Sequence, residues 1–303
     1  MPQPRTDLPA NLPAWRSLLF VPVTRDKFVA SAHTRGADAI ILDLEDSVAE
    51  SEKPRGRTLI HSAAAQVGKG GADVLVRINR PWHHAFRDIE AAVGPGVAAL
   101  MCPKVESPEH LNVIAELLDT LEAERGLPQG HTQLVALIET ADAYFRAREI
   151  AKATPRLVAL NLGAEDFATA VGMEPATETL QGPKQTVIIA ARAAGIVSLG
   201  FMDTVARFDD LEAFRAVVRR SRRFGFTGAS CIHPSQVPIL NEEFGWSEAE
   251  IDRARRMVAA YDAAKAQGLG AVAFEGKMID VPVVERAAAL IRQAERQLAR
   301  RPA

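Results

Sequence analysis

Cysteine is scarce in this sequence. Its 303 residues include two cysteines, Cys102 and Cys231, which lie far apart and outside any CxxC or CxxH spacing. This spacing argues against a zinc site and against a disulfide scaffold, and it is typical of proteins in a reducing compartment. We therefore expect a cytoplasmic protein.

Long apolar runs and an excess of one charge are also missing. No run of about 18 apolar residues occurs, so no membrane span is expected. The first 14 residues are polar and proline-rich, without the apolar centre of a signal peptide. The net charge is -2, which argues against nucleic acid as a partner and against a polybasic membrane anchor.

Several catalytic signatures are absent too. The sequence contains no GxSxG nucleophile elbow, no HExxH or HxxxH zinc pattern, no Cys-His signature and no GxGxxG phosphate loop. These absences disfavour a serine hydrolase, a zinc enzyme and a dinucleotide-binding open sheet.

Short apolar runs alternate with amphipathic stretches along most of the chain. The eight candidate strands span residues 17–22, 37–46, 72–79, 97–106, 133–140, 156–166, 195–204 and 228–236. Near-continuous apolar strands that alternate with helices indicate a parallel sheet covered on both faces. Eight such units predict an α/β fold, a (β/α)8 TIM barrel, with a doubly wound open sheet as the alternative.

The pattern changes after the eighth unit. Residues 247–268 predict one long helix with Ser247 as its cap, and a short irregular piece and a last helix follow. This is more chain than a barrel needs, and Gly268 and Gly270 mark a hinge. We predict three regions: a flexible leader (1–14), a barrel domain (15–240) and a C-terminal helical arm (241–303).

Polar residues recur where the predicted strands end. They are Asp43, Glu45, Asp46, Arg77, Asn79, Lys104, Glu106, Glu139, Glu165, Asp166, Asp203 and His233. In a parallel barrel all these ends meet on one face, where barrel enzymes keep their active sites. Several acids with one arginine and one lysine suit a hard cation together with an anionic substrate.

Glu139 and Asp166 are the candidate metal ligands. Oxygen ligands favour Mg²⁺, which takes one or two carboxylates and leaves other positions to water and substrate. Glu139 ends an otherwise apolar strand, where an unpaired buried carboxylate would be costly. The alternative is a pair of salt bridges at the barrel rim with Lys104 or Arg77.

Nine short motifs occur in a fixed order along the chain: RSLLFVP, IILDLEDSV, VRIN, CPKVE, IET, GAEDF, AARAAG, IHPSQV and MIDVP. Together they resemble the citrate lyase β-subunit-like family of CoA-ester lyases, within the HpcH/HpaI aldolase–citrate lyase superfamily. The resemblance runs from about Trp15 to about Glu285. It is specific to the family, but not to one substrate.

The resemblance implies a Mg²⁺-dependent carbon–carbon lyase that cleaves a 3-hydroxyacyl-CoA reversibly to acetyl-CoA and a 2-oxo acid. Glu139 and Asp166 would hold the metal, and Arg77 would bind the carboxylate of the acid. A guanidinium fork suits that carboxylate better than an ammonium does. Asp43, Glu45 and Asp46 would lie around the metal waters as proton acceptors or orienting groups.

The resemblance also assigns residues to the CoA half of the substrate. Arg16, Lys53 and Arg57 would lie near the CoA phosphates, although Lys53 and Arg57 also suit a solvated helix face. Asp280 would act as a catalytic acid or base carried by the arm into a neighbouring subunit, or it caps the last helix. A shared site implies a homo-oligomer, a trimer or hexamer.

Some positions depart from the family pattern. Gly56 replaces the usual alanine, Thr227 and Ala229 replace an aspartate and a lysine, and the Asp-Gly pair after AARAAG is missing. The DLED motif lacks the histidine of aldolases that act on free 2-oxo acids, which favours a thioester substrate. A metal-dependent aldolase on free 2-oxo acids and a carrier-dependent citrate lyase β subunit remain the alternatives.

Overall fold

The computed structural model describes residue 9, residues 12–203 and residues 210–299. Most of the predicted leader lies outside the described residues. The described residues divide into two compact units: those between 15 and 244 form one, and residues 9, 12–14 and 245–299 form the other. In the described part of the chain, no helix has both the length and the apolar character needed to cross a bilayer.

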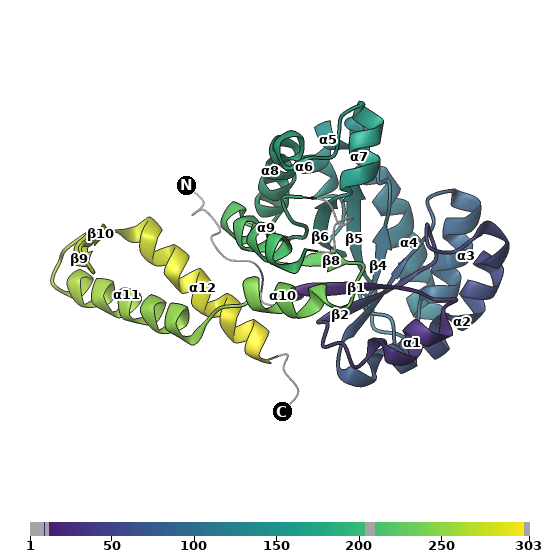
Figure 1. Cartoon of the computed structure of the whole chain (residues 1–303), viewed down its shortest axis with the longest axis horizontal. Coiled ribbons are helices and arrows are strands. Elements are labelled where there is room, and N and C mark those ends of the chain that lie inside the picture. Colours follow the sequence, from purple (N-terminus) through teal and green to yellow (C-terminus); the bar gives the residue numbers. More distant parts are fainter. Residues whose placement is uncertain (1–8, 10–11, 204–209, 300–303) are drawn as a thin grey trace. The chain divides into compact units, whose positions relative to one another are not determined.

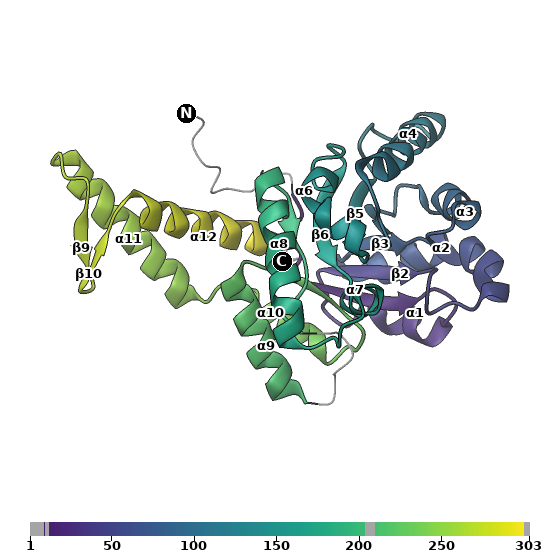
Figure 2. The ribbon, with the colours of Figure 1, turned by 90° about the horizontal axis from the view of Figure 1, so that it is seen from above.

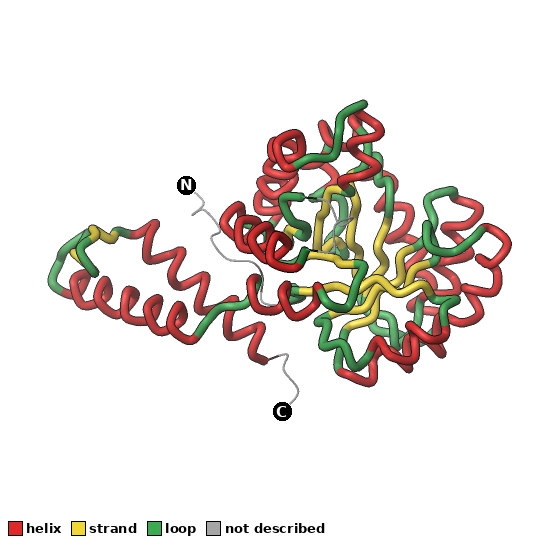
Figure 3. The backbone as a smooth tube through the Cα atoms, viewed as in Figure 1, coloured by secondary structure: helices red, strands yellow, loops and turns green. Residues whose placement is uncertain are grey.

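The larger unit is built around one parallel sheet (Figures 1 and 3). Its strands are β1 (Ser17–Pro22), β2 (Ala39–Asp43), β3 (Asp73–Arg77), β4 (Ala99–Cys102), β5 (Gln133–Ile138), β6 (Leu157–Leu162), β7 (Val197–Ser198) and β8 (Ala229–Cys231). Their spatial order is β7-β6-β5-β4-β3-β2-β1-β8. A parallel bridge between Leu199 and Gly228 joins the two outer strands, so the predicted TIM-barrel fold is confirmed.

Helices follow the strands and cover the outside of the sheet, as Figure 1 shows. They are α1 (Asp26–Ala32), α2 (Lys53–Val67), α3 (Trp82–Ala92), α4 (Pro108–Glu124), α5 (Ala141–Phe145), α6 (Ala147–Ile150), α7 (Ala164–Val171), α8 (Thr177–Ala194), α9 (Leu211–Phe224) and α10 (Gln236–Glu243), with 3-10 turns at Glu50–Glu52 and Gly68–Gly70. Ser107 caps α4 as predicted, by accepting a hydrogen bond from the His110 N–H at 3.3 Å.

Burial of the strands on both faces explains their apolar composition. Every residue of β2 and β4 is buried, and one continuous cluster of apolar side chains links the strands to the helices. Since most strand residues are buried on either face of the sheet, the period-two alternation of a half-exposed strand is absent. Polar side chains therefore collect where the strands end.

The smaller unit is a helical hairpin (Figure 2). Helix α11 (Glu248–Ala266) and helix α12 (Val281–Ala299) are joined by the antiparallel strands β9 (Val272–Phe274) and β10 (Lys277–Ile279). The predicted cap Ser247 forms a capping box with Glu250. Met257, Tyr261 and Val284 contribute to a separate apolar core. That this unit packs on a neighbouring subunit stays a prediction.

Lys184 fastens α8 to the segment after β7. Its side chain is buried, and its ammonium donates hydrogen bonds to the carbonyls of Phe201 and Asp203, at 2.5 Å each. Burial lowers the pKa of Lys184 to about 8 from an ordinary value of 10.5, against the opposing charges of Asp203 and Glu165.

The shift predicts a pH dependence of stability. Between about pH 8 and pH 10.5 the unfolded chain keeps the Lys184 proton that the folded chain has lost, so the folded state gains stability as pH rises. The free energy of unfolding of the wild type, relative to Lys184→Met, should rise across this window by up to about 3 kcal/mol. Urea unfolding at several pH values measures it, with Lys152→Met as the exposed control. A difference independent of pH would contradict the assignment.

Closure of the barrel depends on a glycine. A Cβ on Gly228 would lie 2.0 Å from the Trp15 carbonyl oxygen, whereas a Cβ on Gly182 would meet nothing within 4 Å. Gly228→Ala should therefore lower the free energy of unfolding by roughly 1–3 kcal/mol through overpacking. Gly182→Ala, within α8, should leave it unchanged or raise it by about 0.5–1 kcal/mol. Chemical denaturation checks both, and equal stabilities would contradict the close approach.

Candidate functional site

The polar residues predicted at the strand ends do meet at the carboxyl end of the barrel. The strands are shorter than predicted, so only Asp43 and Arg77 are the last residues of strands, β2 and β3. Glu45 and Lys104 lie in the loops that follow β2 and β4, and Asp166 lies in the first turn of α7. The residues lie close together because adjacent parallel strands end side by side.

Arg77 is surrounded by carboxylates. Its Nε and Nη2 each donate to one oxygen of Asp43 at 2.7 Å, and Nη1 lies 2.7 Å from Glu45 and 3.1 Å from Asp46. The guanidinium carbon lies 4.8 Å from the centre of the Phe20 ring. Burial alone would raise the pKa of Asp43, but the Arg77 fork holds that pKa below its ordinary value. Asp43 and Arg77 are thus a fixed ion pair.

Lys104 connects several strand ends. Its backbone N–H donates to Glu139 Oε2 at 2.6 Å, and its Nζ lies 3.3 Å from both Glu45 Oε1 and Asp166 Oδ1. Its φ is 48°, in the left-handed region that residues with a Cβ seldom adopt. The pKa of Lys104 is raised to about 12: burial alone would lower it, but the surrounding carboxylates outweigh that effect.

Glu139 is the most enclosed of the carboxylates next to Lys104. It is 4% exposed, and its side chain packs so closely on Gly163 that a Cβ there would lie 2.3 Å from Oε1. Burial raises the pKa of Glu139 to about 7, against the Lys104 N–H that lowers it. Burial raises the pKa of Glu45 to about 7 as well. Burial thus disfavours the charged form of both carboxyl groups, a cost that a bound cation would offset.

A divalent cation fits this charge balance. The carboxylates of Asp43, Glu45, Asp46, Glu139 and Asp166 face two cationic side chains, Arg77 and Lys104. Among the described residues, no group of three or more His, Cys, Asp or Glu side chains could hold a metal ion. Glu139 and Asp166 instead offer two carboxylates, the sparse oxygen set that Mg²⁺ uses when water and substrate complete its shell.

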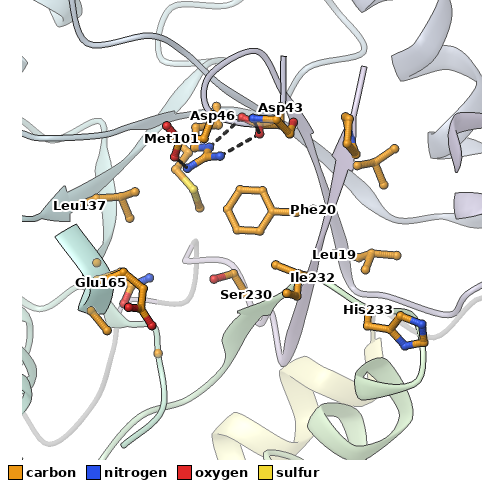
Figure 4. Close-up of a pocket in the computed structure, with 18 of the residues that line it drawn as sticks. Leu19, Phe20, Asp43, Asp46, Met101, Leu137, Glu165, Ser230, Ile232 and His233 are labelled. Carbon is orange, nitrogen blue, oxygen red and sulfur yellow. Dashed lines mark hydrogen bonds and ion pairs between the residues drawn. The ribbon is translucent and has the colours of Figure 1, made fainter. Parts of the chain in front are cut away.

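A cavity of about 760 Å³ opens beside these carboxylates. Figure 4 shows Asp43 and Asp46 on one side, Glu165 on another and the Phe20 ring between them. Much of the remaining wall is apolar, with Met101 and Leu137 among its residues. Such a combination of apolar walls and a few polar groups is typical of small-molecule sites.

Besides the buried Lys184, two further cations that line this cavity were not predicted from the sequence. Lys27 on α1 and Arg35 just beyond that helix line it together with the half-exposed Phe28. The first strand ends in an apolar, proline-containing run. No polar residue at its end therefore indicated a role for the segment that follows. The basic and aromatic residues of the following TRDKF segment are the signal that could have indicated Lys27 and Phe28.

The structure places the predicted CoA-binding cations elsewhere in the larger unit. Arg16 precedes β1, at the opposite end of the barrel, where it forms a 2.8 Å ion pair with Asp38. Arg57 pairs with the buried Asp88 at 2.6 Å. In the described part of the chain, neither these arginines nor Lys53 are among the residues that line the cavity. Their contact with CoA phosphates stays a prediction.

Lys53 has a clear structural role behind the site. Its buried Nζ donates to the carbonyls of Leu44 and Glu45, both at 3.0 Å, and to Asn79 at 2.6 Å. Asn79 in turn donates to Asp88 at 2.6 Å. A lysine bound in this way fixes the loop that carries Glu45, so its position on α2 supports the site from behind.

Asp280 belongs to the smaller unit, between β10 and α12. Its Oδ1 accepts a hydrogen bond from the Val283 N–H at 3.4 Å, which is the contact of a helix cap. The capping role and the predicted catalytic role do not exclude each other, because one carboxylate oxygen remains for a second partner. The catalytic role of Asp280 stays a prediction.

Known proteins resemble this chain over nearly its whole length. The citrate lyase subunit beta of Leuconostoc mesenteroides subsp. cremoris is 35% identical over 285 residues, covering 92% of this chain and 93% of the relative. The L-malyl-CoA/beta-methylmalyl-CoA lyase of Rhodobacter capsulatus is 33% identical over 318 residues, covering 96% and 98%.

A crystal structure extends the comparison to three dimensions. The CitE protein of Mycobacterium tuberculosis, in complex with magnesium, acetoacetate and coenzyme A, is 32% identical, with a TM-score of 0.73 and coverage of 95% of this chain and 100% of that chain. The model of the HpcH/HpaI aldolase/citrate lyase family matches residues 16–234. The chain belongs to this family and is an oxo-acid lyase.

Proposed function

We propose that this enzyme is a Mg²⁺-dependent lyase that cleaves a 3-hydroxyacyl-CoA of the malyl-, citramalyl- or citryl-CoA type, reversibly, to acetyl-CoA and a 2-oxo acid. The observation that carries the proposal is the placement of Glu139, Asp166 and Arg77 around one cavity. Glu139 and Asp166 would hold a hard cation that binds the oxygens of a hydroxy acid. Arg77 would offer its guanidinium to the carboxylate of that acid.

The size and the mixed lining of the cavity support a substrate with several chemically different parts. Its lining combines carboxylates with the cations of Lys27 and Arg35 and the aromatic ring of Phe28. A CoA thioester has a polar acyl end, a less polar pantetheine chain and an anionic nucleotide. We infer that the phosphates lie near Lys27 and Arg35, because these cations line the cavity. Arg16, Lys53 and Arg57 have other partners.

Mg²⁺ held by Glu139 and Asp166 would supply Lewis-acid polarisation of the acid's oxygens. Arg77, fixed by Asp43, would orient the substrate carboxylate. Glu45, whose burial raises its pKa to about 7, is suited to accept the hydroxyl proton near neutral pH. The carbon–carbon bond then breaks to a 2-oxo acid and a thioester enolate, and Asp280 would donate a proton to the enolate carbon.

The relatives support the reaction class and define the alternatives. One relative is named for malyl-CoA chemistry and another as a citrate lyase subunit. A CitE crystal structure from Mycobacterium tuberculosis contains magnesium and pyruvate. Incubating the pure chain and Mg²⁺ with malyl-, citramalyl- and citryl-CoA, and with the corresponding free acids, tests the proposal. Release of a 2-oxo acid from a thioester supports it. Cleavage of free acids alone, or of neither class, would contradict it.

Removing the charge of one proposed metal ligand should weaken Mg²⁺ binding without affecting folding. Glu139→Gln keeps an acceptor for the Lys104 N–H but loses the charge that binds Mg²⁺. We expect Mg²⁺ affinity to fall at least about 100-fold and turnover with it, with little change in thermal stability. Calorimetric Mg²⁺ titration measures the loss, and Glu149→Gln, at an exposed position of α6, is the charge-matched control. Unchanged Mg²⁺ affinity would refute the ligand assignment.

A shared active site predicts complementation between inactive subunits. We propose a homo-oligomer, a trimer or hexamer, in which the arm brings Asp280 to a neighbour. Asp280→Asn and Arg77→Ala chains should each be inactive, and mixed oligomers should regain part of the activity because some sites contain both intact residues. Activity is measured after dissociation and joint reassembly, with each variant reassembled alone as the control. No recovery in oligomers shown to be mixed would contradict the shared site.

A further inference from the structure

The backbone of Lys104 is held in an unfavourable conformation next to the proposed metal site. Among the described residues, Lys104 and Glu275 are the two non-glycine residues with positive φ, and Lys104 has φ 48°. A left-handed residue with a Cβ persists only where the surrounding contacts impose it. The contacts of this peptide therefore indicate what the conformation achieves.

Both polar groups of the Lys104 backbone are engaged. The N–H donates to Glu139 Oε2 at 2.6 Å, while the carbonyl oxygen accepts from Arg80 Nε at 3.1 Å. The first contact holds the carboxylate of Glu139, a proposed metal ligand, from the side of β4. The second fixes the orientation of the carbonyl, and with it the conformation of the left-handed residue.

Arg80 is itself held from two further directions. Its Nη2 donates to Glu106 Oε2 at 2.7 Å, and its guanidinium carbon lies 5.5 Å from the centre of the Trp82 ring. Trp82 packs in turn against His110, with ring centres 4.8 Å apart. A guanidinium can contact the Lys104 carbonyl, the Glu106 carboxylate and the Trp82 ring at the same time. An ammonium does not have the same planar set of donors.

We propose that Arg80 is a positioning residue for the metal carboxylate Glu139 and acts through the Lys104 peptide. The inference rests on the proposed function, in which Glu139 is a ligand of Mg²⁺. Without Arg80, Lys104 relaxes toward an ordinary backbone conformation and its N–H turns from Glu139. The carboxylate then loses the donor that orients it, and Mg²⁺ binding weakens without any change in the metal ligands themselves.

A surface ion pair between Arg80 and Glu106 is the competing explanation. Such pairs contribute little to stability, and the side chain of Glu106 is 55% exposed. This explanation predicts that Arg80→Lys, which keeps the charge, behaves like the wild type. The positioning role predicts that Arg80→Lys resembles Arg80→Gln, because neither side chain reproduces the fork between Lys104 and Glu106.

The test measures hydrogen exchange of the Lys104 amide without metal and the Mg²⁺ dissociation constant by calorimetry. In Arg80→Gln and Arg80→Lys we expect Lys104 exchange to become at least about tenfold faster and Mg²⁺ binding about tenfold weaker, the lower end for outer-shell partners of a metal site. Arg215→Gln is the control: Arg215 lies on the outer helix α9 and pairs with two carboxylates. This variant should change neither the exchange rate nor the Mg²⁺ dissociation constant. Glu106→Gln provides a milder variant if the Arg80 variants fail to fold, and it should shift both values in the same direction.

The outcomes separate this inference from the proposed function. Unchanged Lys104 exchange in the Arg80 variants would overturn the positioning contact, even if the wild type binds Mg²⁺ normally. Faster exchange with an unchanged Mg²⁺ dissociation constant would overturn the role in metal binding. A wild type that binds no Mg²⁺ would overturn the proposed function and the metal role of Arg80 together.

Discussion

The structure of the site depends on a surplus of negative charge enclosed at the carboxyl end of the barrel. Burial raises the pKa values of two carboxyl groups here, Glu45 and Glu139, to about 7, although nearby positive charge and a backbone N–H act in the opposite direction. Such a surplus is costly unless another positive charge binds. Arg77 and Lys104 supply positive charge directly beside these carboxylates, and the divalent cation that we propose would add to it.

The fold concentrates this charge while keeping the rest of the interior apolar. Parallel strands that are buried on both faces leave polar side chains few places other than the strand ends. Behind those ends, Lys53 and Asp88 form a buried hydrogen-bonded network through Asn79. This network ties α2 and α3 to the loop of Glu45. Stability and the geometry of the site are therefore coupled through the same buried polar groups.

The barrel and the polar strand ends were predictable from the sequence, because apolar runs and the acids that follow them are local features. The spatial partners were not, because they depend on how loops turn after each strand. Arg16 illustrates this: its motif resembles a CoA-binding segment, yet its side chain pairs with Asp38 at the amino end of β1. Lys104 shows the converse, since its left-handed backbone leaves no trace in the composition of CPKVE. Lys27 and Arg35 became apparent only once the cavity was defined.

The most direct test of this account is a crystal structure of the enzyme soaked with Mn²⁺, which can replace Mg²⁺ and scatters anomalously. We expect one strong anomalous peak within roughly 2.0–2.3 Å of carboxylate oxygens of both Glu139 and Asp166, the distance range of such bonds. A peak held instead by Asp43 and Glu45, or no peak at the barrel end under saturating Mn²⁺, would contradict the central claim.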